Sequence, residues 1–155
     1  MMHGFSQRSQ WYAIAVAIGA AIIWRLFAFD FFGVTPHVML VAVLLVAFFV
    51  RRAVVFAWGI AGILLCTAYV PFFQFEYLLL VVVGIAGFIF ARAVIFEHKL
   101  PLFIGTVAVA QVVWWIGIGY GTTIFTVPFV LEFLYNAIVA SALFFIAVWL
   151  EETFS

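Results

Sequence analysis

Charged side chains are scarce in this sequence. Six Lys or Arg and six Asp or Glu make up 8% of its 155 residues, whereas 70% of the residues are hydrophobic. A soluble domain carries about 25% charged and about 45–50% apolar residues. So few charges cannot cover a water-soluble globule of this size, which excludes a soluble enzyme and a disordered segment. The formal net charge of zero provides no field that would attract nucleic acid. We therefore interpret the chain as an integral membrane protein.

Cysteine is nearly absent, and residues typical of catalytic motifs are few. The single cysteine, Cys66, excludes an internal disulfide and any multi-cysteine metal site. His3, His37 and His98 fall in the N-terminal tail and on opposite predicted sides of the membrane, so they cannot share a metal ion. The sequence has no His-Glu-x-x-His, Gly-x-Ser-x-Gly or Gly-x-x-x-x-Gly-Lys motif. We predict a protein that is not an enzyme and that carries no cofactor or metal.

Long apolar stretches are abundant. A helix needs about 20 mostly apolar residues to cross a hydrocarbon core of about 30 Å. Thr35 and Pro36 predict the N-cap and the first helical residue of the second stretch. The predicted fold is all-α, a polytopic membrane bundle of about six transmembrane helices over residues 11–150, with cytoplasmic tails at 1–10 and 151–155. The predicted spans are residues 11–32, 36–50, 53–70, 77–96, 101–118 and 127–150.

The second stretch, residues 36–50, is short for a bilayer. Local thinning of the bilayer or burial against neighbouring helices would compensate for its length. The alternative is a bundle of five spans in which residues 36–50 are re-entrant.

The distribution of basic residues predicts the orientation. Loops on the cytoplasmic side carry an excess of Lys and Arg near the ends of the spans. With six spans and the N-terminus inside, five of the six basic residues fall on the inner side: Arg8, Arg51, Arg52, Arg92 and Lys99. We therefore predict that both termini are cytoplasmic (N-in/C-in) in the cell membrane, and that the last four of these residues are basic anchors at its inner surface.

Small residues recur at helical spacing. A Gly-Ile-Ala-Gly sequence occurs twice, and Ala13, Ala17 and Ala21 follow one another at every fourth position. The glycines of the repeated sequence are Gly59, Gly62, Gly84 and Gly87. Because lipid provides little hydrophobic force between helices, small residues that permit close packing replace it. We predict helix packing within the chain; a docking face for a partner is the alternative, and the two glycine pairs leave open whether the chain contains an internal repeat.

A few polar residues fall inside the predicted spans. A charged group near the middle of a bilayer costs about 2.5–3.5 kcal/mol on insertion scales, so it is usually paired or functional. Arg25 and Glu132 are predicted at similar depth, with Asn136 one turn from Glu132 on the same face and Gln111 near the middle of the fifth span. We expect Arg25 and Glu132 to contact each other within this intramembrane polar cluster, with Asp30 as a competing partner for Arg25. A structural ion pair and a contact to a ligand or partner both remain open.

From Thr35 onward, the order of elements resembles the rod shape-determining protein MreD. Five features carry the resemblance: a proline at the start of the second span, a basic pair after it, a third span rich in glycine and alanine, a fourth span that ends in arginine, and a last span that contains Glu132 and Asn136. The residues concerned are Pro36, Arg51-Arg52, Gly59 to Gly62, Arg92 and Leu131 to Ala137. The resemblance covers about residues 35–150. It implies a non-enzymatic membrane scaffold of the cell-elongation machinery, which would bind an MreC-like partner near peptidoglycan synthases and MreB filaments.

The alternative function is transport. The stripe Ala13, Ala17 and Ala21 resembles the docking motif on the first span of substrate-binding S components of energy-coupling-factor transporters, which take up vitamin-type small molecules. Such a component needs a polar pocket that faces outward, whereas the predicted outer loops are short and carry few hydrogen-bonding side chains. We therefore rank the scaffold first, with membrane lipid and a membrane protein as its partners and no nucleic acid.

Overall fold

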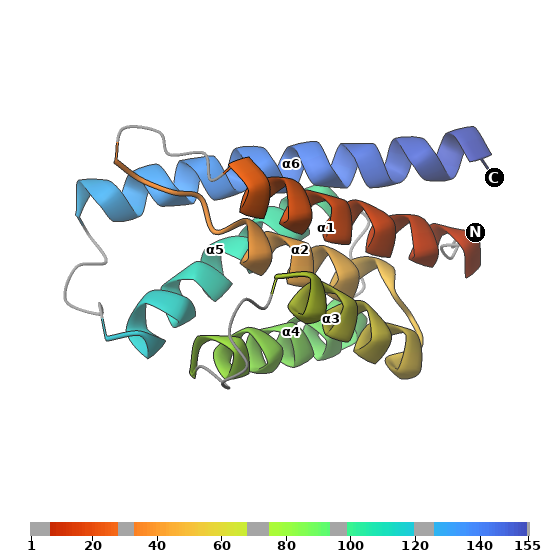
Figure 1. Cartoon of the computed structure of the whole chain (residues 1–155), viewed down its shortest axis with the longest axis horizontal. Coiled ribbons are helices and arrows are strands. Elements are labelled where there is room, and N and C mark those ends of the chain that lie inside the picture. Colours follow the sequence, from red (N-terminus) through yellow and green to blue (C-terminus); the bar gives the residue numbers. More distant parts are fainter. Residues whose placement is uncertain (1–6, 28–32, 68–74, 94–98, 120–125, 155) are drawn as a thin grey trace.

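The computed structural model describes residues 7–27, 33–67, 75–93, 99–119 and 126–154. The regular elements of this part of the chain are helices: α1 (Gln7–Phe27), α2 (Val38–Phe49), α3 (Ala53–Thr67), α4 (Phe75–Ala93), α5 (Lys99–Gly117) and α6 (Val127–Phe154). The helices run back and forth along the molecule (Figure 1). The start of α1 and the end of α6 lie at the same end, where the ring centroids of Tyr12 and Phe154 are 6.0 Å apart.

The all-α prediction is confirmed over the described residues. Four helices are long and apolar enough to cross a membrane, namely α1, α4, α5 and α6, whereas α2 and α3 are shorter apolar helices. Several apolar helices of this length are typical of a membrane protein. The count of six spans and the N-in/C-in orientation stay predictions.

Two helices extend beyond their predicted spans into the predicted tails. Helix α1 begins at Gln7, inside the predicted tail 1–10, and α6 continues to Phe154, through most of the predicted tail 151–155. Charged and amide side chains end an apolar span but are good helix formers, so the helix continues past them. Parts of the predicted spans at 28–32, 68–70 and 94–96 lie outside the described residues.

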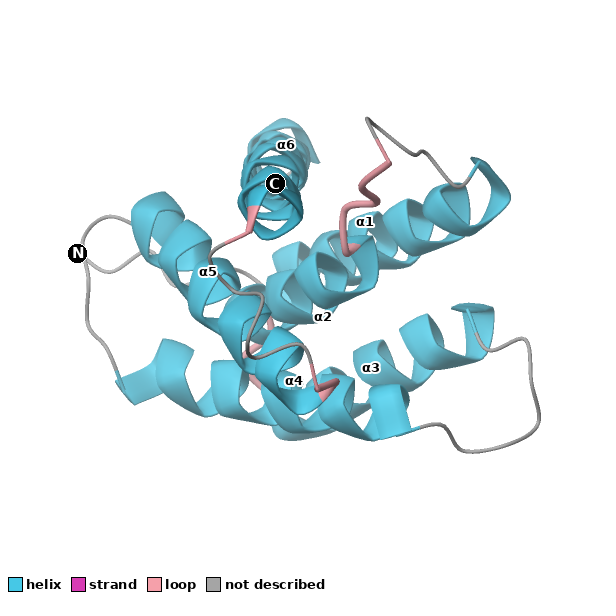
Figure 2. Cartoon of the chain, turned by 90° about the vertical axis from the view of Figure 1, so that its left-hand side faces the viewer, coloured by secondary structure: helices cyan, strands magenta, loops and turns pink. Residues whose placement is uncertain are grey.

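Helix α2 is the centre of the bundle. Ten of its 12 residues are buried, and α1, α3, α4, α5 and α6 all pack against it (Figure 2). A helix that is hydrophobic all round is typically a buried one. At 1.5 Å per residue, α2 is about 18 Å long, too short for a bilayer, but protein rather than lipid surrounds it. Helix α2 is thus buried against its neighbours, one of the two arrangements expected for a short second stretch.

Close approach to α2 explains three of the predicted packing glycines. A Cβ on Gly59 would lie 2.8 Å from Val46 Cγ1, and one on Gly84 would lie 2.7 Å from Val43 Cγ1. A Cβ on Gly87 would lie 2.7 Å from the α2 residue Leu44. Side chains at these positions would hold α3 and α4 away from the core helix. These glycines therefore let α3 and α4 approach α2 closely.

The remaining small residues also pack inside the bundle. Gly62 faces Ile18 of α1, whose side chain would be 3.0 Å from an added Cβ. The stripe Ala13, Ala17 and Ala21 is completely buried in the core. The stripe is therefore an internal packing face of α1.

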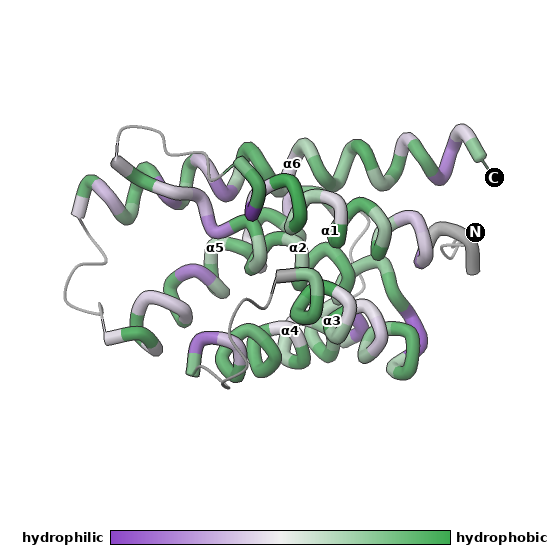
Figure 3. Tube along the Cα trace, in the orientation of Figure 1, coloured by the Kyte–Doolittle hydropathy of each residue, from purple (hydrophilic) through white to green (hydrophobic). Residues whose placement is uncertain are grey.

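The outer surface of the bundle is apolar. Large hydrophobic side chains on the outer helices are exposed, among them Leu26, Trp58, Val109 and Ile138. Hydrophobic residues dominate every helix in Figure 3. A water-soluble protein rarely exposes so much contiguous apolar surface, whereas a bundle in lipid does so without cost.

Candidate functional site

The N-terminal end of α2 is held by polar groups from two helices. The His37 Nδ1 atom accepts a hydrogen bond from the Leu40 backbone N–H at 3.2 Å. The backbone N–H of His37 donates to Asn136 Oδ1 at 2.7 Å. The first N–H groups of a helix have no partner within it, so a buried helix needs such caps. The helix begins at Val38 with His37 as N-cap, so the prediction of Thr35 as N-cap and Pro36 as first helical residue was wrong by two positions.

Asn136 and Gln111 form the buried part of this network. Both side chains are completely buried. Asn136 Nδ2 donates to Gln111 Oε1 at 3.2 Å, and Gln111 Nε2 donates to the Phe129 carbonyl at 3.4 Å. The structure thus brings together these two members of the predicted polar cluster. It adds His37, which the sequence signals only as a polar residue directly before a long apolar run.

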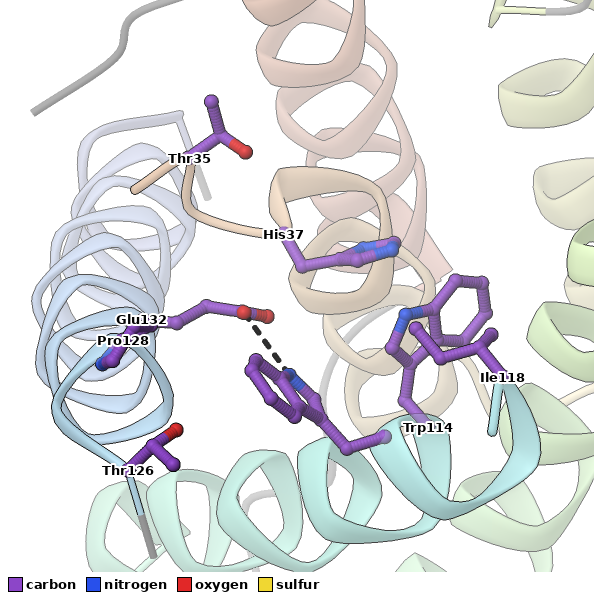
Figure 4. Close-up of a pocket in the computed structure, with 8 residues that line it drawn as sticks. Thr35, His37, Trp114, Ile118, Thr126, Pro128 and Glu132 are labelled. Carbon is purple, nitrogen blue, oxygen red and sulfur yellow. Dashed lines mark hydrogen bonds between the residues drawn. The ribbon is translucent and has the colours of Figure 1, made fainter. Parts of the chain in front are cut away.

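Glu132 lies one turn before Asn136 on α6 and is half-buried. Its Oε2 atom accepts a hydrogen bond from the Trp115 indole N–H at 3.0 Å. The bond is the dashed line in Figure 4, where Glu132 points from α6 toward the core of the bundle. Trp115 is a second residue that the sequence analysis missed, because a tryptophan near a helix end is equally typical of the membrane interface.

Arg25 lies elsewhere, so the expected contact with Glu132 was wrong. The Arg25 Nη1 atom donates to the Cys66 carbonyl at 2.7 Å. Cys66 belongs to the last turn of α3, where carbonyl groups lack a partner within the helix. Arg25 is exposed on the flank of α1 that meets α3. The two residues were predicted at similar depth, but depth alone does not determine whether their side chains face each other. The competing partner Asp30 lies outside the described residues.

The C-terminal end of α2 is capped in the same way as its start. Arg92 of α4 donates to the Val50 carbonyl and to the Phe88 carbonyl. The Gln10 side chain of α1 accepts a hydrogen bond from the Arg51 backbone N–H at 3.2 Å. Both ends of the core helix are therefore closed by side chains from neighbouring helices.

The predicted basic anchors differ in their surroundings. Arg51 and Arg52 are exposed in the turn between α2 and α3, and Arg92 lies at the same end of the bundle because it contacts Val50. Lys99 is the first residue of α5, and its side chain lies outside the described part of the structure. Arg92 thus caps a helix in addition to any contact with lipid.

Two of the cavities in the described part of the structure border α2 or its N-cap. One, of about 550 Å³, opens where α2 begins (Figure 4) and is lined by Thr35, His37, Trp114, Trp115, Ile118, Thr126, Pro128 and Glu132. The other is an apolar groove of about 650 Å³ between α4 and α5, lined by Leu44, Val82, Val83, Ala86, Gly87, Phe90, Pro101, Leu102, Gly105, Thr106, Val109, Ala110 and Val113. Leu44 belongs to α2, so the groove reaches the core helix.

The described residues contain no group of three or more His, Cys, Asp or Glu side chains that could hold a metal ion. The fold of the described residues defines the class: an all-helical protein with several helices apolar enough to cross a membrane, built around an enclosed core helix. The sequence matches no known protein family and no curated protein, and the fold matches no solved structure. The resemblance to MreD therefore stays a prediction.

Proposed function

We propose that the chain is a non-enzymatic membrane scaffold that acts through helix–helix contacts with a membrane partner. The observation that carries this proposal is the groove between α4 and α5. Its lining is apolar and includes small residues on both walls, with Ala86 and Gly87 on α4 and Gly105 and Ala110 on α5. Small residues let the backbone of a second helix approach closely, which is the main source of affinity between helices in lipid.

The polar residues support the same function. Asn136 and Gln111 bond to each other, and His37 and Arg92 bond to backbone groups at the ends of α2. Groups engaged in this way stabilise the bundle. The bundle is therefore best suited to associate with other membrane helices through its apolar surface.

The particular scaffold that we propose is MreD-like, with an MreC-like partner, in the peptidoglycan elongation machinery of the cell membrane. The order of elements over residues 35–150 supports it. We also propose six spans with both termini inside. Arg51, Arg52 and Arg92 support this orientation, because they gather at the end that holds the start of α1 and the end of α6.

Depletion of the protein in its native host tests the function. A scaffold for elongation predicts that rod-shaped cells become round and that the gene neighbours those for MreB and MreC. Cells that keep their shape but grow only when a nutrient is supplied would contradict the scaffold.

A substrate-binding component of a small-molecule uptake transporter is the second candidate. The cavity beside His37 and Glu132 favours it, since it lies at the end of the bundle that we propose to face outward. The stripe Ala13, Ala17 and Ala21 no longer supports it, because a buried stripe cannot dock a partner. Mass spectrometry of the purified protein distinguishes the two, because an uptake component should carry a small molecule at a stoichiometry near one.

A further inference from the structure

We infer that the cavity at the start of α2 binds a small organic cation, an ammonium group carried on an apolar or aromatic body. The inference rests on the cavity alone and does not depend on the scaffold function. A volume of about 550 Å³ is within the range of small-molecule sites, about 300–1,000 Å³.

Glu132 gives the cavity its charge. Among the described residues of the lining, it is the one with a formal charge. In the part of the chain that the structure describes, no basic side chain forms an ion pair with it. Arg25 donates to the carbonyl of Cys66, and Arg51, Arg52 and Arg92 lie at the opposite end of the bundle. Trp115 contributes a hydrogen bond but no charge. A carboxylate has two oxygens with about four acceptor sites, so a ligand with N–H or N–CH₃ groups can bind beside the indole.

Helix dipoles do not reverse this charge. The N-terminal ends of α2 and α6 and the C-terminal end of α5 meet at the cavity, with His37, Pro128 and Ile118 in its lining. Each end contributes about half an elementary charge, positive at N-termini and negative at C-termini. The two positive ends and one negative end leave about half a positive charge, which is smaller than the full negative charge of Glu132. The N-terminal end of α2 is also capped within the chain.

Aromatic rings form part of the wall, beside Thr35, Ile118, Thr126 and Pro128. Trp114 and Trp115 line the cavity, and tryptophan is the best partner for a cation over an aromatic face. The Trp114 and His37 rings meet edge to face with centroids 4.3 Å apart, across from Glu132 in Figure 4. His37 adds no competing positive charge, because its Nδ1 accepts a hydrogen bond and so carries no proton. The Glu132 carboxylate accepts the Trp115 N–H and the Trp114 ring borders the same cavity, so an organic ammonium ion could contact a carboxylate and an aromatic ring together.

The cavity lies at the ends of helices, where a bundle meets the polar zone of a membrane. The ammonium group can therefore come from a soluble molecule or from the headgroup of an aminophospholipid. A bare metal ion is a poorer fit, because a single carboxylate among indole rings offers too few ligands.

Binding is measured by calorimetry on the full-length protein in detergent micelles free of phospholipid. The probes are benzyltrimethylammonium, choline and 3,3-dimethylbutan-1-ol, which is the uncharged isostere of choline. We expect saturable binding of both cations and at least about tenfold weaker binding of the isostere, since the isostere lacks the charge that the carboxylate and the ring faces attract. Equal affinity for choline and its isostere, or no saturable binding of either cation, would overturn the inference.

Two variants separate recognition from folding. Glu132→Gln keeps an oxygen that accepts the Trp115 N–H, so the thermal stability should be unchanged while the affinity for benzyltrimethylammonium falls at least about tenfold. Glu152→Gln removes the same charge at the opposite end of α6 and should leave the affinity unchanged. If the two variants bind the probe equally well, Glu132 does not recognise the cation and the inference fails.

The source of the ammonium group follows from the same titration in lipid nanodiscs. Phosphatidylglycerol discs and discs that also contain phosphatidylethanolamine are compared. Weaker probe binding only in the second kind of disc assigns the site to a lipid headgroup, whereas equal binding in both assigns it to a soluble cation. Either assignment requires that the Glu132→Gln variant binds the probe more weakly.

Discussion

Several side chains bond to backbone groups at the ends of helices. His37 and Asn136 hold the first N–H groups of α2, Arg92 holds the carbonyl that follows it, and Arg25 holds a carbonyl in the last turn of α3. A helix end without such partners leaves polar groups unsatisfied in surroundings that contain no water. Most of the polar residues that the sequence places within the bundle are therefore explained by the backbone that they cap.

Substitution of Asn136 should show this role. Asn136→Leu removes the acceptor for the His37 N–H, and we expect the free energy of unfolding to fall by about 1–3 kcal/mol, because a buried donor is left without a partner. Ser141→Ala on the same helix is the matched control, since Ser141 bonds only to the carbonyl of Ala137 one turn earlier. Unfolding of the purified protein in mixed micelles gives both values.

A double-mutant cycle then tests the network. Gln111→Leu combined with Asn136→Leu should cost less than the sum of the two single substitutions, because the two side chains bond to each other. Strict additivity, or no loss in the Asn136 variant, would show that the network does not stabilise α2.

The core helix α2 is the element on which the fold depends. The other five helices pack around it, and α3 and α4 approach it over glycines. Its side chains are apolar on every face because every face meets protein.

Gly84→Ala tests the close approach of α4 to α2. The added methyl would lie 2.7 Å from Val43 Cγ1, and the β-branched Val43 cannot easily turn away. We expect a loss of about 1–3 kcal/mol from overpacking. Gly19→Ala is the control, because an added Cβ there meets nothing within 4 Å and alanine favours a helix. Equal stability of the two variants would place α4 farther from α2 than the structure has it.

The sequence predicts the helices better than their arrangement. Apolar length indicates each helix, but an apolar face looks the same whether lipid or protein covers it. The central position of α2 therefore could not be read from residues 36–50. The sequence placed Asn136 and Gln111 in one intramembrane polar cluster, but it gave no indication that these two side chains bond to each other. The pairing of Arg25 with Glu132 was wrong because depth does not determine which side of the bundle a residue faces.

At the scale of the whole molecule, the bundle has two unlike ends. One end carries Arg51, Arg52 and Arg92, together with the start of α1 and the end of α6. The other end carries the cavity beside Glu132. An unequal distribution of basic residues of this kind determines the orientation of membrane proteins.

Cysteine labelling tests the orientation. Arg52 and Thr126 are exposed at opposite ends, and each is replaced by cysteine after Cys66→Ala. With a membrane-impermeant reagent, we expect labelling at position 126 in intact cells and at position 52 only after the membrane is permeabilised. The reverse pattern would mean that the basic end faces outward.

Site-specific photo-crosslinking in the native membrane tests most directly whether the groove binds a partner helix. Val109 in the groove and Ile138 on α6 are each 65% exposed, and a photoreactive residue is placed at one or the other. The account predicts one specific membrane protein, expected to be MreC-like, crosslinked from position 109 and not from position 138. Gly105→Leu should abolish that crosslink, because its side chain fills the groove where an added Cβ meets nothing within 4 Å. No protein crosslinked from position 109, equal yields from both positions, or a crosslink that survives Gly105→Leu would contradict the account.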